Sequence, residues 1–130
     1  MQSSVTPRTD KAHDVLHQER QPLDAIFQPR NVAVIGQGSA GLFFNFDLRR
    51  LGAARVIGLD LEASRLKRSV TFGATHTIHN AKGDACRMLR EITGGQLADV
   101  VVEAAGEVAA INLAIDLVRH SGAILYFGYP

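Results

Sequence analysis

The sequence predicts an α/β fold in which helices cover both faces of a parallel β-sheet. Short runs rich in Val, Ile and Leu alternate with longer segments typical of helices from residue 31 to residue 130. Five strands alternating with four helices require right-handed β-α-β crossovers, which make the strands parallel. With 130 residues, 46% of them hydrophobic and 21% charged, the chain has the size and composition of one soluble domain.

Each predicted strand is an apolar or β-branched run, and most of the helices end near a glycine. The first strand, Asn-Val-Ala-Val-Ile closed by Gly36, is typical of a buried parallel strand. Gly52 is expected to form the left-handed cap of the first helix. In chain order we expect strand 31–35, helix 39–51, strand 55–60, helix 62–72, a weaker strand 75–79, helix 84–93, a strongly apolar strand 98–104, helix 107–119 and strand 123–127.

Residues 1–30 differ from the rest and are expected to form a polar, partly disordered leader. This segment holds three of the four prolines and few large apolar side chains. A short helix around 11–20 is the one regular element it could form. The domain therefore starts at residue 31.

The charge balance and the single cysteine exclude several classes of protein. Lys plus Arg number 14 and Asp plus Glu 13, so the net charge of +1 gives no general reason to bind nucleic acid or an anionic membrane. No apolar run approaches the roughly 18 residues of a membrane span, and no signal-peptide core is visible. Because Cys86 has no second cysteine to pair with, a reducing, cytoplasmic setting fits best.

The segment 36–41, Gly-Gln-Gly-Ser-Ala-Gly, has the pattern G-x-G-x-x-G directly after a predicted strand and at the start of a predicted helix. Gly36 permits the tight turn, and Gly38 lets the main chain approach a pyrophosphate closely. Gly41 lets the helix pack against the first strand. The free N–H groups at the helix start, from Ser39 and Ala40 onward, then face the phosphates. The alternative is an ordinary β-α turn that happens to be rich in glycine.

An acid at the end of the second strand strengthens the prediction of dinucleotide binding. Asp60 stands 19 residues beyond Gly41, where an acid binding the adenosine ribose hydroxyls is expected. Its carboxylate would repel a 2′-phosphate, and neither Leu61 nor Glu62 could receive one. We therefore expect NAD rather than NADP.

Five segments in order resemble the cofactor domain of zinc-type alcohol dehydrogenases, within the medium-chain dehydrogenases/reductases. This resemblance covers about residues 31–130 and implies a Rossmann fold, a doubly wound parallel sheet of strand order 3-2-1-4-5, whose sixth strand is missing here. It also implies that zinc, the proton relay and the alcohol or polyol substrate belong to a catalytic domain that is absent from the chain. The chain alone would then bind NAD but be inactive. The segments are 32–42 (VAVIGQGSAGL), 51–60 (LGAARVIGLD), 73–76 (GATH), 93–106 (TGGQLADVVVEAAG) and 126–130 (YFGYP).

The resemblance also implies roles for residues beyond the glycine loop. Arg65 matches the basic residue beside the adenosine ribose, although a helical ion pair with Glu62 is the alternative. The segment after the fourth strand matches the stretch near the ribose linkages, and the segment after the fifth matches the backbone that binds the nicotinamide carboxamide. The expected cofactor-binding residues are Gly36, Gly38, Ser39, Ala40, Gly41, Asp60, Arg65, Ala105, Gly106, Phe127, Gly128 and Tyr129; no catalytic or metal-binding residue is expected.

Several other residues are set aside as sites. The pairs His13/His17 and His76/His79 lack a third metal ligand or point to opposite faces, and Cys86 has no histidine to activate it. Asp99 and Glu103 flank one strand and are interpreted as structural or cofactor-proximal. Asn45 and Asp47 in the first helix depart from the family, and a carboxylate facing the sheet would weaken its packing.

Two rival hypotheses and two kinds of partner remain open at this stage. The chain could be a non-catalytic, nucleotide-sensing Rossmann module, or an unproductive gene fragment. Beyond the dinucleotide, its partners could be a second copy of the chain or a separately encoded catalytic domain.

Overall fold

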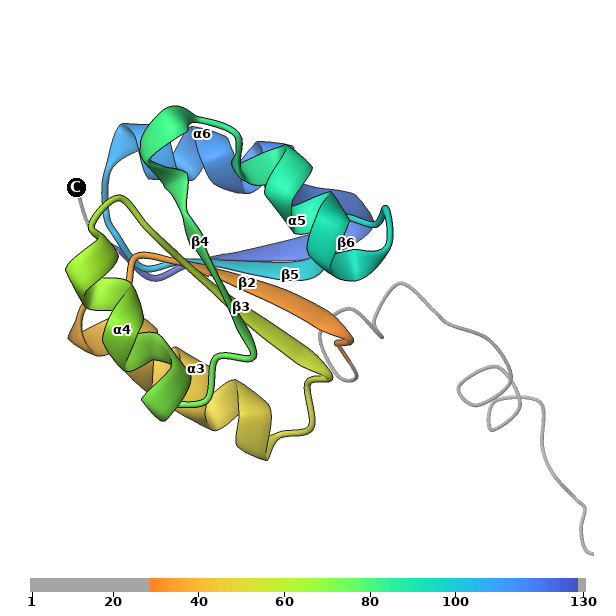
Figure 1. The fold of residues 1–130 in the computed structure, drawn as a ribbon. Coiled ribbons are helices and arrows are strands. Elements are labelled where there is room, and N and C mark those ends of the chain that lie inside the picture. The colour runs from red at the N-terminus through yellow and green to blue at the C-terminus, as the bar shows by residue number, and fades with distance from the viewer. Residues whose placement is uncertain (1–28, 129–130) are drawn as a thin grey trace, which may run out of the picture.

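The computed structural model describes residues 29–128, whose five strands form one parallel sheet with helices on both faces (Figure 1). The sheet order β4-β3-β2-β5-β6 is 3-2-1-4-5 along the chain, which confirms the predicted fold class. The strands are β2 (Asn31–Ile35), β3 (Arg55–Asp60), β4 (His76–His79), β5 (Ala98–Glu103) and β6 (Val118–Tyr126). The helices are α3 (Ser39–Arg50), α4 (Ala63–Thr71), α5 (Ala85–Thr93) and α6 (Val108–Leu117), with a 3-10 turn η1 (Asn80–Lys82).

The central strand β2 is buried along its whole length, as a parallel strand covered on both faces must be. Ala33 and Ile35 belong to the apolar cluster under α5 and α6, whereas Val32 and Val34 belong to the cluster on the α3 side. This alternation follows the two-residue period of a strand. β2 pairs in parallel with β3 on one side and with β5 on the other, so the carboxyl ends of these three strands lie side by side.

Most predicted boundaries are confirmed to within one residue, but the last strand is a correction. β6 begins at Val118 rather than at residue 123, and α6 ends at Leu117 rather than at 119. The polar segment at the start of β6 is held on the sheet by a long-range contact, because Nε of Arg119 donates to Oδ1 of Asp99 in β5 at 2.6 Å. Gly52 has the expected positive φ of 101°, although the helix cap is the preceding residue, Leu51.

No carboxylate weakens the packing of the first helix on the sheet, because Asp47 is exposed. Asn45 is wholly buried, and its Nδ2 donates to Oε1 of Gln37 at 2.6 Å. The packing of α3 therefore includes a hydrogen-bonded amide rather than a carboxylate. The predicted leader, with His13 and His17, falls almost entirely on residues 1–28, outside the described residues.

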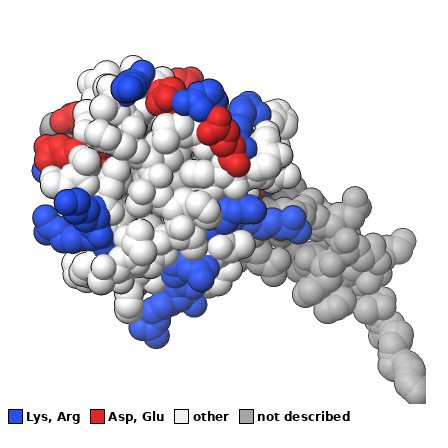
Figure 2. All heavy atoms as spheres, viewed as in Figure 1, with Lys and Arg blue, Asp and Glu red and all other residues white. Residues whose placement is uncertain are grey.

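The surface carries charges of both signs. On the face shown in Figure 2, basic and acidic side chains lie around a broad uncharged area and do not gather into one basic patch. Within residues 29–128, no helix is long and apolar enough to cross a membrane.

Candidate functional site

A cleft of about 570 Å³ opens at the carboxyl ends of β2, β3 and β5, between the glycine loop and α6. Open α/β sheets bind ligands at the carboxyl ends of their strands, at the place where the connections from neighbouring strands lead to opposite faces of the sheet. The cleft is lined by five of the residues predicted to bind cofactor: Gly36, Gly38, Asp60, Arg65 and Ala105. The structure thus brings the glycine loop, the strand-end acid and the loop after β5 to one cavity.

Close contacts require two of the three glycines of the loop. Gly36 has a φ of +93°, and a Cβ on it would lie 2.9 Å from the backbone N of Ala105. A Cβ on Gly41 would overlap the carbonyl oxygen of Gly36, so only glycine lets α3 start this close to the turn. A Cβ on Gly38 would meet nothing within 4 Å, which leaves open space for a ligand above the main chain there.

The first turn of α3 has backbone N–H groups that no hydrogen bond within the helix uses. The first helical hydrogen bond is donated by the N–H of Leu42 to the carbonyl of Gly38, at 3.0 Å. The N–H groups of Ser39, Ala40 and Gly41 come before it in the helix and have no intrahelical acceptor. Together with the positive end of the helix dipole they favour an anion at this position.

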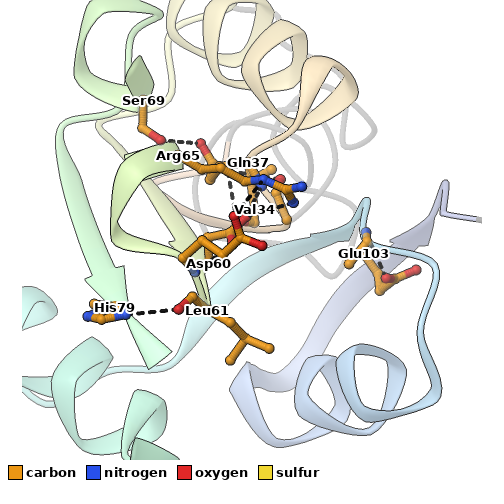
Figure 3. Close-up of polar contacts among 11 residues, drawn as sticks. Val34, Gln37, Asp60, Leu61, Arg65, Ser69, His79 and Glu103 are labelled. Atoms are coloured by element: carbon orange, nitrogen blue, oxygen red, sulfur yellow. Dashed lines mark hydrogen bonds and ion pairs between the residues drawn. The ribbon is translucent and has the colours of Figure 1, made fainter. Parts of the chain in front are cut away.

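Asp60 is held in place by the backbone around it (Figure 3). It is 8% exposed; its Oδ2 accepts the N–H of Gln37 at 2.8 Å, and its Oδ1 accepts the N–H of Glu62 at 2.9 Å. A carboxylate oxygen can accept more than one hydrogen bond, so both oxygens of Asp60 can also accept a hydroxyl. The acid is thus oriented before any ligand is present.

Arg65 lies between two carboxylates, and the ion pair with Glu62 that was the alternative to its cofactor role is present. Its Nη1 lies 3.8 Å from Oδ2 of Asp60, and its Nε lies 3.6 Å from Oε1 of Glu62. The guanidinium is half exposed at the cleft, so both ion pairs are weak ones that a ligand can rearrange.

Glu103 joins the segment predicted to lie near the ribose linkages to the segment predicted to bind the nicotinamide carboxamide. It is completely buried, and its Oε2 accepts the N–H groups of Ala105 at 2.9 Å and of Gly106 at 2.6 Å. Its backbone carbonyl accepts the N–H groups of Phe127 at 2.9 Å and of Gly128 at 2.8 Å. Among the described residues, Oε1 of Glu103 has no hydrogen-bond partner.

Not every predicted residue reaches the cleft. The predicted residues at this edge of the sheet that do not line the cavity are Ser39, Ala40, Gly41, Gly106, Phe127 and Gly128. The ring of Phe127 instead packs edge-on against Phe44 of α3, with ring centroids 5.1 Å apart. Tyr129 lies outside the described residues.

Sequence reasoning missed several residues of the site. The buried side chain of Gln37 occupies a variable position of the glycine pattern, which carries no signal for a role. Asn80 follows β4, and Asn112 and Asp116 lie on α6; all three line the cleft. Their position at the carboxyl edge becomes visible only once the strand order is known.

The other candidates lie away from the cleft or lack ligands. Within residues 29–128 there is no group of three or more His, Cys, Asp or Glu side chains that could hold a metal ion. His76 and His79 are both exposed, and Nε2 of His79 lies 2.9 Å from the carbonyl oxygen of Leu61. Cys86 is half buried near the start of α5, with Sγ 4.0 Å from the carbonyl oxygen of Asp116.

Asp99 has a structural role at the start of β5. Burial raises its pKa, but the hydrogen bond from Arg119, those from the N–H groups of Arg30 and Asn31, and the charge of Arg119 together outweigh burial and hold the pKa below its ordinary value. The charged carboxylate therefore joins the start of β2 to β5 and β6.

A family model described as zinc-binding dehydrogenase matches residues 41–130. The sorbitol dehydrogenase of Bacillus subtilis (strain 168) is 35% identical over 99 residues, which are 76% of this chain and 28% of that enzyme.

Solved structures agree with the sequence comparison. The alcohol dehydrogenase TADH from Thermus sp. ATN1 superposes with a TM-score of 0.75 at 32% identity, over 84% of this chain and 32% of that one. A putative zinc-binding dehydrogenase from Sinorhizobium meliloti 1021, bound to NADP, superposes with a TM-score of 0.74 at 25% identity, over 83% of this chain and 35% of that one. The chain therefore spans about a third of each structure and less than a third of the B. subtilis enzyme.

Proposed function

Because this chain belongs to the zinc-binding dehydrogenase family, we propose that it binds a nicotinamide dinucleotide, NAD in preference to NADP, as the cofactor domain of an alcohol or polyol dehydrogenase. In such an enzyme the bound nicotinamide accepts a hydride from the alcohol. The residues described here serve to bind and orient the dinucleotide. We expect the 130-residue chain by itself to bind NADH without oxidising alcohols, since zinc in this family belongs to the catalytic domain.

One observation carries the proposal: Gly36 and Gly38 of the glycine loop, which leads directly into α3, line the same cleft as Asp60. The open space at Gly38 and the N–H groups of the first turn of α3 suit a pyrophosphate. Asp60, 8% exposed and fixed by two backbone N–H groups, suits the two hydroxyls of an adenosine ribose. The residues present therefore fit a dinucleotide.

The preference for NAD rests on charge. A 2′-phosphate would meet the carboxylate of Asp60, and the nearest cation, Arg65, is already shared between Asp60 and Glu62. The S. meliloti relative is bound to NADP, so the family as a whole does not fix the preference. In this chain it depends on Asp60.

Fluorescence titration tests the proposal. We expect NADH to bind saturably and at least about tenfold more tightly than NADPH. Equal or tighter binding of NADPH would remove the role proposed for Asp60. No saturable binding of either cofactor to the folded chain would overturn the proposed function as a whole.

A further inference from the structure

The side chain of Gln37 points into the protein from the middle of the glycine loop and is 2% exposed (Figure 3). Its Nε2 donates to the carbonyl oxygens of Val34 at 3.1 Å and Gly36 at 3.2 Å. Its Oε1 accepts Nδ2 of Asn45 and Oγ of Ser69, both at 2.6 Å. All four hydrogen-bonding positions of the amide are therefore in use.

The partners of Gln37 come from different elements. Asn45 lies on α3 and Ser69 on α4, and both side chains are completely buried. Gly58 on β3 leaves room for the amide, because a Cβ there would lie 2.7 Å from Oε1 of Gln37. One side chain thus fixes the loop to both helices on this face of the sheet.

The main chain of the same residue extends the connection to Asp60. The N–H of Gln37 donates to Oδ2 of Asp60 at 2.8 Å. This single residue links the loop proposed to hold the pyrophosphate, the acid proposed to hold the ribose, and the helices behind them.

Stability alone does not account for this network. Burying three polar side chains is costly, and Oδ1 of Asn45 has no hydrogen-bond partner among the described residues. Apolar side chains of similar volume would generally serve stability as well or better. What the network does provide is a defined position for the loop, since the two donors of the Gln37 amide bind carbonyls at and just before the turn.

We propose that Gln37 is a positioning residue for the dinucleotide, whose buried amide fixes the glycine loop on α3 and α4 so that the loop and Asp60 stand in the binding arrangement before the ligand arrives. This inference rests on the proposed function. A loop ordered in advance loses less conformational freedom on binding, and the affinity is higher for that reason. Gln37 does not need to touch the ligand with its side chain.

The test replaces the whole network by apolar side chains of similar total volume, in the variant Gln37→Met, Asn45→Ala, Ser69→Ala. We expect the 130-residue chain to keep a cooperative unfolding transition and a 1:1 stoichiometry. Its Kd for NADH and for ADP-ribose should rise about 5- to 10-fold. A merely structural role would lower the folded fraction, and with it the stoichiometry, without changing the Kd of the folded molecules.

A matched control disturbs a network at the opposite edge of the sheet. Asp99→Asn removes the charge that joins β2, β5 and β6, so it should lower stability and leave the Kd for NADH unchanged. If the triple variant binds NADH as tightly as the parent, the inference on Gln37 is overturned while the proposed function stands. If the parent itself does not bind NADH, both are overturned.

A second variant decides the matter if the triple variant does not fold. Ser69→Ala removes one of the two bonds to Oε1 of Gln37 and hardly changes the volume. We expect the Kd for NADH to rise about two- to threefold, which is the size of change that the loss of one hydrogen bond produces. An unchanged Kd in this variant would contradict the inference.

Discussion

Replacing Glu103 by alanine should destabilise the fold by about 3–4 kcal/mol, a large part of the roughly 5–15 kcal/mol that holds a domain together. The carboxylate is completely buried and accepts two backbone N–H groups, at 2.9 and 2.6 Å. Each bond to a charged acceptor contributes about 1.5–3 kcal/mol. Alanine leaves both donors without this acceptor; the N–H of Gly106 is buried, whereas Ala105 is exposed and its N–H can bond to water instead. Part of this loss is offset because a buried charge is removed.

The variant Glu103→Gln separates hydrogen bonding from charge. Its amide oxygen can accept the same two N–H groups, and its nitrogen replaces Oε1, which has no hydrogen-bond partner among the described residues. We therefore expect a loss of only about 1 kcal/mol. Glu91→Ala is the control, because Glu91 is exposed and its ion pair with Arg87 lies in solvent, so its removal should hardly change the stability.

Urea unfolding followed by circular dichroism at pH 7 measures these differences. With a slope of about 1–3 kcal/mol per M, the alanine variant should unfold at a urea concentration lower by about 1–3 M. The reasoning would be refuted if Glu103→Ala stayed within about 1 kcal/mol of the parent, or if glutamine proved as harmful as alanine.

Three further predictions concern other parts of the site and the fold. Because the pKa of Asp99 is lowered on folding, its charge stabilises the fold above the ordinary pKa of about 3.9, and this stabilisation is lost as the pH falls through the lowered value. Asp99→Asn should therefore lower the free energy of unfolding by about 2 kcal/mol at pH 7, measured by urea unfolding. That difference from the parent should shrink below about pH 4. In fluorescence titrations, Asp60→Ser should weaken NADH binding about 10- to 100-fold and NADPH binding by a smaller factor. An unchanged ratio of the two affinities would count against the ribose contact. Gly41→Ala should lower stability by about 1–3 kcal/mol or more, because its Cβ would overlap the carbonyl of Gly36; a thermal midpoint equal to that of the parent would contradict that contact.

The sequence was sufficient for the sheet and for the glycine loop, for physical reasons. Buried parallel strands are apolar on both faces, so β2 and β5 stand out as continuous runs of Val, Ile and Ala. The close approach at Gly36 and Gly41 excludes other residues, which makes the loop visible as a glycine pattern. Asp60 was found because the order of the elements gives its position at the same edge.

The parts that were missed depend on contacts between distant residues. The first residues of β6, among them Arg119, are polar and resemble a loop until their partner Asp99, 20 positions earlier in the chain, is known. Gln37 stands at a variable position of the glycine pattern, so its network with Ser69, 32 positions away, leaves no local signal.

The most direct test of the account is to map the cleft itself by NMR during a titration with NADH. We predict saturable shifts of backbone amide signals at three places that come together only in this fold: the loop and helix start at 36–41, the end of β3 from Asp60 to Arg65, and the segment after β5 at Ala105 and Gly106. Shifts concentrated instead at the opposite edge of the sheet, around Asp99 and Arg119, or no saturable shifts in the folded chain, would contradict the assignment of this cleft to a dinucleotide.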